Sequence, residues 1–122
     1  MYNLVLDLSH LITNRGVVEN NILEAAHYGD LDTIKAAVAE NADSVNFFDK
    51  FTGSTALHIS AGSGNFSCVE FLAKCDGIDL FRADNDGKEA VHYAYEIGHY
   101  VIVDFLMDRM YPARLKINKL DF

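Results

Sequence analysis

Histidines are the residues of this chain that could do acid–base or metal chemistry, and two of them are regularly placed. His58 and His92 stand 34 residues apart, and each lies six residues before a glycine, Gly64 or Gly98. An imidazole titrates near neutral pH and is a common metal ligand, so such a pair could serve as general bases or as ligands. The sequence has neither a His-Glu-x-x-His run nor a Cys-x-x-Cys pair. We therefore expect no metal, no cofactor and no catalytic residue.

Other catalytic signatures are missing too. There is no Gly-x-Ser-x-Gly run for a serine nucleophile and no Gly-x-x-x-x-Gly-Lys loop for a phosphate. The acidic residues are scattered, so spacing does not single out a catalytic pair of carboxylates. The chain is expected not to be an enzyme, and it is expected to have no small-molecule substrate.

The regular spacing continues to a third glycine, which indicates a repeat rather than a pair of active histidines. Gly29, Gly64 and Gly98 are 35 and 34 residues apart, the period of proteins built from stacked helical pairs. A short helix is predicted before each glycine, at residues 22–28, 55–63 and 89–97. Apolar residues at helical spacing predict a second helix after each one, at residues 31–38, 66–73 and 101–107.

Two segments carry a more specific pattern. Residues 53–64 read GSTALHISAGSG, and residues 84–98 read DNDGKEAVHYAYEIG. They resemble the ankyrin repeat family, whose pattern is Asp-x-x-Gly-x-Thr-Pro-Leu-His-x-Ala-Ala-x-x-Gly, with alanines (Ala56 and Ala90) in place of its proline. The resemblance implies an all-α fold, a short ankyrin-repeat solenoid of about three helix-turn-helix repeats. An N-terminal capping helix and hairpin-like loops would complete it.

The motif residues have structural roles in this interpretation. Thr55 can cap a helix through its hydroxyl, and the glycines suit turns that need a positive φ. The resemblance implies that His58 and His92 hydrogen-bond to neighbouring backbone and link adjacent repeats. The predicted structural residues are Gly29, Gly53, Thr55, His58, Gly64, Gly87, His92 and Gly98.

One domain is expected over residues 1–122. Its predicted parts are an N-terminal cap (1–16), repeat 1 (17–48), repeat 2 (49–81), repeat 3 (82–111) and a C-terminal tail (112–122). The cap is predicted to be an amphipathic helix, with a short strand as the alternative. The tail is predicted to cover the end of the stack in irregular or extended form, with disorder as the alternative. Tyr95 replaces the small residue of earlier units, which favours repeat 3 as the last.

The charge is acidic and uneven. The formal net charge is −8, yet residues 1–108 hold 17 acidic and 6 basic side chains, while residues 109–122 hold 4 basic and 1 acidic. The excess of acidic side chains over residues 1–108 repels nucleic acid and favours a basic protein partner, although this excess could serve solubility alone. No apolar run could span a bilayer and the N-terminus lacks the charge of a secretory signal, so we expect a cytoplasmic location.

Binding of another protein is therefore the expected function. The resemblance implies binding through a concave face made of hairpin tips and first helices. Three aromatics within residues 47–51 are costly to leave in water and could anchor a partner; at least one is expected to be buried and one exposed. An acidic strip from Asp84 to Glu96 is the second region of interest. The predicted partner-binding residues are His27, Tyr28, Phe47, Phe48, Phe51, Thr52, Ser54, Ser63, Asn85, Asp86, Lys88, Glu96 and Ile97.

These observations lead to a ranked set of functions. The first is a module that binds a basic protein and inhibits or neutralises it, as an immunity protein or enzyme inhibitor does, acting as a monomer or in complex with its partner. The alternative is a scaffold or regulatory adaptor that uses mainly apolar contacts. A small enzyme ranks third.

Overall fold

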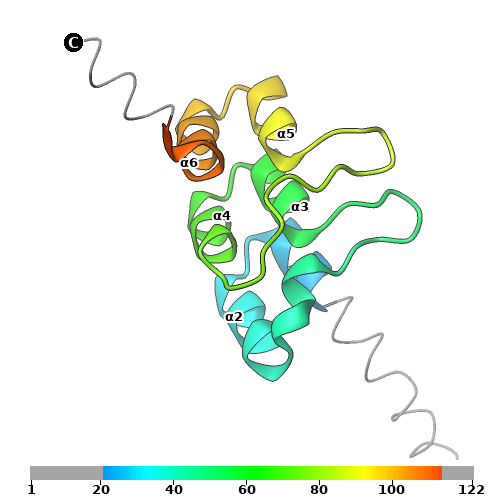
Figure 1. Ribbon diagram of the computed structural model, residues 1–122. Coiled ribbons are helices and arrows are strands. Elements are labelled where there is room, and N and C mark those ends of the chain that lie inside the picture. The colour runs from blue at the N-terminus through cyan, green and yellow to red at the C-terminus, as the bar shows by residue number, and fades with distance from the viewer. Residues whose placement is uncertain (1–20, 114–122) are drawn as a thin grey trace, which may run out of the picture.

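The computed structural model describes residues 21–113 (Figure 1). Within that range the regular structure is helical, apart from an isolated bridge between Phe48 and Thr55. Residues 21–28 form the first helix. The further helices are α2 (Leu31–Glu40), the 3-10 helix η1 (Ala42–Asn46), α3 (Ala56–Ser63), α4 (Phe66–Ala73), α5 (Ala90–Glu96) and α6 (Tyr100–Met110). The prediction of an all-α repeat solenoid is confirmed, whereas the predicted cap and residues 114–122 of the tail lie outside the described residues.

The helices form two layers (Figure 1). α2, α4 and α6 stack along one side, α3 and α5 lie beside them, and two long loops project from the α3 and α5 side, next to each other. Each first helix is joined to its second helix through a glycine in left-handed conformation, with φ of 73° at Gly29, 76° at Gly64 and 80° at Gly98. A residue with a Cβ is strained in that conformation, which is why glycine recurs there.

The core is made of side chains that recur at the repeat period. Ile34 and Val69 lie at the same position of α2 and α4 and are 0% exposed, and Leu72 and Leu106 lie at the same position of α4 and α6 and are at most 1% exposed. Ser60 and Ala94 are equivalent positions on α3 and α5, and both are fully buried. Small side chains at these positions let the first helices pack closely together. The core is therefore continuous from one repeat to the next.

The two projecting loops are named after the repeats to which they belong: the second loop is residues 47–55, before α3, and the third loop is residues 81–89, before α5. The two loops hydrogen-bond to each other. The Asn85 amide N–H donates to the Thr52 carbonyl at 2.9 Å, and the Asn85 side-chain amide donates to the Phe51 carbonyl at 3.0 Å. A Cβ on Gly53 would come within 2.9 Å of the Asn85 backbone nitrogen. Glycine at position 53 is what allows the third loop to approach the second.

The element boundaries differ from the predicted ones in two places. α6 extends to Met110, whereas the apolar pattern predicted helix only to residue 107. The break predicted after α2 contains η1, which Asn41 begins by accepting a hydrogen bond from the Asp43 amide on its side chain. Polar residues that end an α-helix can thus begin a tighter helical turn.

Replacing Gly53 or Gly87 with alanine should have unequal effects, although the two φ values are 76° and 78°. Gly87→Ala should lower the free energy of unfolding by about 1 kcal/mol, the cost of a left-handed alanine. Gly53→Ala should cost about 1–2 kcal/mol more, because its Cβ meets the Asn85 backbone, whereas no described atom lies within 4 Å at Gly87. Urea unfolding of both variants checks this, and equal losses would contradict it.

Candidate functional site

His58 ties three parts of the structure together. It is 3% exposed, and its Nδ1 accepts the Thr55 amide N–H at 3.1 Å. The His58 amide in turn donates to the Thr55 hydroxyl, closing a capping box at the start of α3. Because Nδ1 is an acceptor, Nε2 carries the proton and donates to the Lys88 carbonyl at 2.9 Å. This one ring therefore caps a helix and holds the next hairpin.

Asp84 organises that next hairpin. It is 7% exposed, and its carboxylate accepts the amide N–H groups of Asp86 and Lys88, each at 2.9 Å, and the Tyr93 hydroxyl. Burial alone would raise the pKa of the Asp84 carboxyl, but these hydrogen bonds outweigh burial and hold the pKa below its ordinary value. The hydrogen bond to Asp84 raises the pKa of Tyr93 to about 12. A buried, ionised carboxylate thus fixes the hairpin and the tyrosine together.

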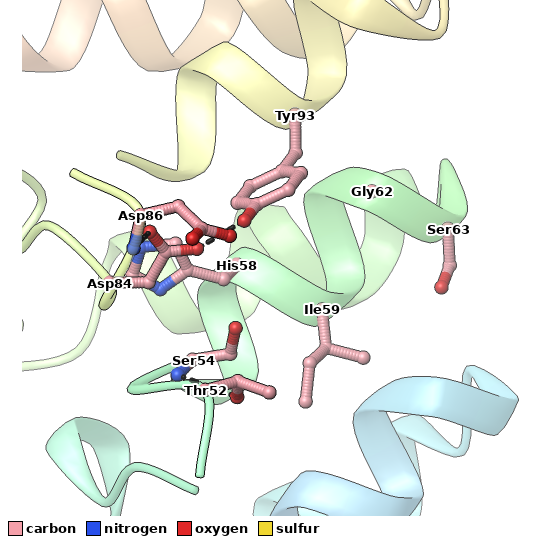
Figure 2. A pocket seen from close by; sticks show the side chains of 9 residues that line it. All are labelled: Thr52, Ser54, His58, Ile59, Gly62, Ser63, Asp84, Asp86 and Tyr93. Atoms are coloured by element: carbon pink, nitrogen blue, oxygen red, sulfur yellow. Dashed lines mark hydrogen bonds between the residues drawn. The ribbon is translucent and has the colours of Figure 1, made fainter. Parts of the chain in front are cut away.

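A pocket of about 310 Å³ opens between these elements (Figure 2). Its polar walls come from two aspartates and from serine and threonine hydroxyls, while Ile59 and the Tyr93 ring give apolar surface. It is lined by Thr52, Ser54, His58, Ile59, Gly62, Ser63, Asp84, Asp86 and Tyr93. The pocket therefore lies where the second and third loops meet α3 and α5.

Four predicted partner-binding residues line this pocket: Thr52, Ser54, Ser63 and Asp86. The structure brings them together from the second loop, α3 and the third loop, although they are up to 34 residues apart in the chain. The sequence analysis missed Ile59 and Tyr93. Both directly follow the motif histidine, and their identity differs between the two motifs, a signal that the repeat pattern does not fix the residue at this position.

The three phenylalanines of the second loop have different surroundings. Phe47 is half-buried against the hydrophobic core, so its main role is packing rather than anchoring. Phe48 is 48% exposed, and the Arg82 guanidinium lies 4.3 Å from its ring centroid. Phe51 is 91% exposed. Phe51 is therefore the aromatic side chain of this loop that is most available to a partner.

The acidic strip expected from Asp84 to Glu96 is not a continuous charged surface. Asp84 is buried, and Glu96 pairs with the Lys88 ammonium at 2.9 Å. Asn85 is exposed, but its side chain holds the second loop. Ile97 is half-exposed after the end of α5. Asp86 is the acidic residue of this strip that both is exposed and lines the pocket.

The predicted residues of the first repeat lie apart from this pocket. His27 and Tyr28 are exposed and pack edge to face, with ring centroids 5.1 Å apart. Tyr28 lines a smaller depression of about 190 Å³ on the first helix, together with Glu24 and Asp30. The thirteen predicted residues therefore do not form one patch.

His92 differs from His58 in one respect. Its Nδ1 accepts the Glu89 amide N–H at 2.9 Å, so it caps α5 as His58 caps α3. His92 is exposed, however, and among residues 21–113 no hydrogen bond joins its Nε2 to a following repeat. Residues 21–113 contain no further repeat for His92 to contact, so its role as a link between repeats stays a prediction.

Residues 21–113 contain neither a cluster of metal ligands nor a membrane-spanning helix. No group of three His, Cys, Asp or Glu side chains in this range could hold a metal ion. No helix there is both long enough and apolar enough to cross a membrane.

The described helices define a helical-repeat solenoid, and the pocket lies on its loops and first helices. A model of ankyrin repeats in three copies matches residues 22–119. The chain therefore belongs to the ankyrin repeat family, whose repeats are protein-interaction modules and generally lack enzymatic activity.

Several known proteins are similar to this chain over part of their length. Mouse ARF GTPase-activating protein GIT2 is 34% identical over 83 residues, which is 68% of this chain and 11% of that protein. Inversin from Gallus gallus is 33% identical over 70% of this chain and 8% of its own length. Notch-regulated ankyrin repeat-containing protein from Xenopus tropicalis is 42% identical over 57 residues, 47% of this chain and 49% of that protein. This chain spans about a tenth of the length of the GIT2 relatives.

Stability should fall as the pH is lowered through the range where His58 takes up a proton. Burial lowers the pKa of His58 below its ordinary value of 6.5. The imidazole of His58 therefore binds a proton more readily in the unfolded chain than in the folded one. The contribution of the neutral His58 ring to the free energy of unfolding is complete above pH 6.5 and is lost as the pH falls toward the pKa of the folded state. Urea unfolding between about pH 7.5 and about pH 5 measures the slope.

His58→Gln provides the comparison for this slope. Its side-chain amide can still donate to the Lys88 carbonyl, but it does not titrate. The variant should be less stable near neutral pH and should lose less stability on acidification than the wild type. The same loss in both proteins would show that His58 is not the titrating group.

Proposed function

We propose that this chain is a protein-binding module that inhibits or neutralises a basic protein partner by covering it. The partner would contact the pocket between the second and third loops and the loop tip beside it. The proposal rests on one observation above all. Phe51 is 91% exposed, next to Thr52 of the pocket wall. An aromatic side chain left in water beside a polar pocket is the typical anchor of a protein interface.

The charges around the pocket support a basic partner. Its walls include the Asp84 and Asp86 carboxylates and no lysine or arginine. The nearby cations already have partners: the Lys88 ammonium pairs with Glu96 and lies 5.4 Å from the centroid of the Tyr93 ring, and Arg82 lies over the Phe48 ring. Over residues 1–108 acidic side chains outnumber basic ones by 17 to 6. Complementary charge raises the rate of association and aligns the partner.

The alternative is a scaffold or regulatory adaptor whose contact is mainly apolar. The exposed aromatic side chains favour it, since Phe48 and Tyr28 are 48% and 76% exposed in addition to Phe51. Apolar contacts do not depend on ionic strength, so salt separates the two functions.

Phe51→Ala should weaken partner binding by at least about 1 kcal/mol, roughly fivefold in Kd, because the anchor is lost while the fold is untouched. The partner is first captured from native lysate on immobilised wild-type protein and identified by mass spectrometry; titration calorimetry then compares the variants. Val101→Ala is the control, since Val101 is 71% exposed on α6 and does not line the pocket. Equal binding by Phe51→Ala and wild type would rule out the loop tip as the anchor.

The association rate with that partner should fall about tenfold between about 20 mM and about 150 mM salt if charge steers binding. Asp86→Asn should slow association at low salt and change the dissociation rate little, because Asp86 is exposed at the pocket rim. Stopped-flow or surface plasmon resonance measures both rates. An association rate that is insensitive to salt would favour the apolar adaptor instead.

A further inference from the structure

The pocket between the second and third loops carries negative charge without an ion-pair partner. The Asp84 carboxylate is 7% exposed, and its hydrogen bonds hold its pKa below the ordinary value, so it is ionised at neutral pH. Within residues 21–113 no ion pair includes Asp84 or Asp86, and the nearby Lys88 ammonium is paired with Glu96. Burial lowers the pKa of His58, so this neighbouring ring is neutral. A carboxylate away from water is strongly stabilised by a cation placed beside it, so the pocket favours a bound cation.

Hydrogen-bond acceptors also remain free in this pocket. The Asp84 carboxylate accepts three hydrogen bonds, from the Asp86 and Lys88 amides and the Tyr93 hydroxyl. An ionised carboxylate has about four acceptor sites, so one is left. Ser54 lines the pocket too, and within residues 21–113 its hydrogen bonds involve its backbone and not its hydroxyl. A cation that donates several hydrogen bonds at once therefore suits this wall.

The wall opposite the aspartates lacks one side chain. Figure 2 shows the two aspartates on one side of the pocket and Gly62 on the other. Gly62 lies within α3 and has no positive φ, so the backbone does not require glycine there. The equivalent positions of the neighbouring repeats hold His27 and Glu96. Glycine at this position therefore leaves space that a side chain would fill.

The size and the apolar surface of the pocket suit a single long side chain. Its volume of about 310 Å³ is at the lower end of the range of about 300–1,000 Å³ that is typical of ligand pockets. Ile59 and the Tyr93 ring offer apolar surface to a hydrocarbon stem. The Lys88 ammonium already lies 5.4 Å from the centroid of the Tyr93 ring, so this ring accepts a cation beside it. Arginine joins such a stem to a flat, weakly hydrated cation with five N–H donors, whereas the ammonium of lysine is more strongly hydrated and has three donors.

We propose that this pocket binds one arginine side chain of the protein partner. The guanidinium donates hydrogen bonds to the Asp84 carboxylate and the Ser54 hydroxyl, and the stem lies against Ile59 and Tyr93. Asp86 is exposed at the rim and attracts the side chain during the encounter. The inference rests on the proposed function, because it specifies the group by which a basic partner is recognised, but the pocket can be tested without the partner.

A titration of the ¹⁵N-labelled full chain with N-acetyl-arginine methylamide, followed by NMR, tests the pocket. The amide signals of Gly62, Ser63 and Asp86 should shift and saturate together. N-acetyl-citrulline methylamide has nearly the same shape and no charge, so it should bind at least about tenfold more weakly. N-acetyl-lysine methylamide should also bind more weakly than the arginine compound.

Gly62→Gln should fill the pocket and weaken binding of the arginine compound at least about tenfold. A Cβ on Gly62 would lie 3.6 Å from the Tyr93 Cβ, an ordinary contact, so the new side chain extends into the pocket without forcing the helices apart. Glutamine favours a helix more than glycine does, so the urea midpoint should not fall. Ser67→Gln is the matched control, because Ser67 is exposed on α4 and does not line the pocket, and it should bind like the wild type.

The wild-type titration decides the proposal whatever the variants do. No saturating shift up to about 50 mM of the arginine compound, or equal binding of the citrulline or the lysine compound, would overturn it. Unchanged arginine binding by folded Gly62→Gln would overturn it as well.

The captured partner separates this inference from the proposed function. If Phe51→Ala loses the partner but Gly62→Gln keeps it, the proposed function stands and the arginine pocket is overturned. If the pocket selects the arginine compound but the captured partner is not basic and binds independently of salt, the pocket stands and the proposed function fails.

Discussion

The hydrogen bonds of His58 are the interaction on which the rest of the structure depends. One buried ring accepts the Thr55 amide N–H and donates to the Lys88 carbonyl 30 residues away. The first bond defines where α3 begins, and the second fixes the third loop against it. The pocket has one wall on α3 and another on the third loop, so its shape follows from this ring. An imidazole suits the task because its two nitrogens can act as acceptor and donor at once.

The repeat architecture explains why equivalent positions of successive repeats have different surroundings. The second and third repeats each contribute a helix cap, a left-handed glycine and a close-packed first helix, and a repeat is covered by the one that follows it. The second repeat has that neighbour, and Ala61 and Gly53 are covered by it. The equivalent residues of the third repeat, Tyr95 and Gly87, have no such cover within residues 21–113. A nearest-neighbour architecture therefore concentrates its unsatisfied surface at its ends.

Part of the lining of the pocket could be predicted from the sequence. The motif assigned scaffold roles to a few positions and left Thr52, Ser54, Ser63 and Asp86 as candidates, and these four line the pocket. It did not show that Asp84 is buried, or that Lys88 is paired with Glu96 rather than open to a partner. Such facts depend on which side chains meet across loops, and the repeat period carries no information about them.

The sequence by itself determined the repeat and its register, because left-handed turns require glycine and close-packed helices require small residues at fixed spacing. Both requirements concern single positions, so the residue type at each position reveals them. Only the tertiary structure decided which aromatic of residues 47–51 is exposed: Phe47 packs on the core while Phe51 stays in water. It also decided that the pocket lies between the second and third loops. Exposure and pocket shape arise where two repeats meet, and that contact depends on folding of the chain as a whole.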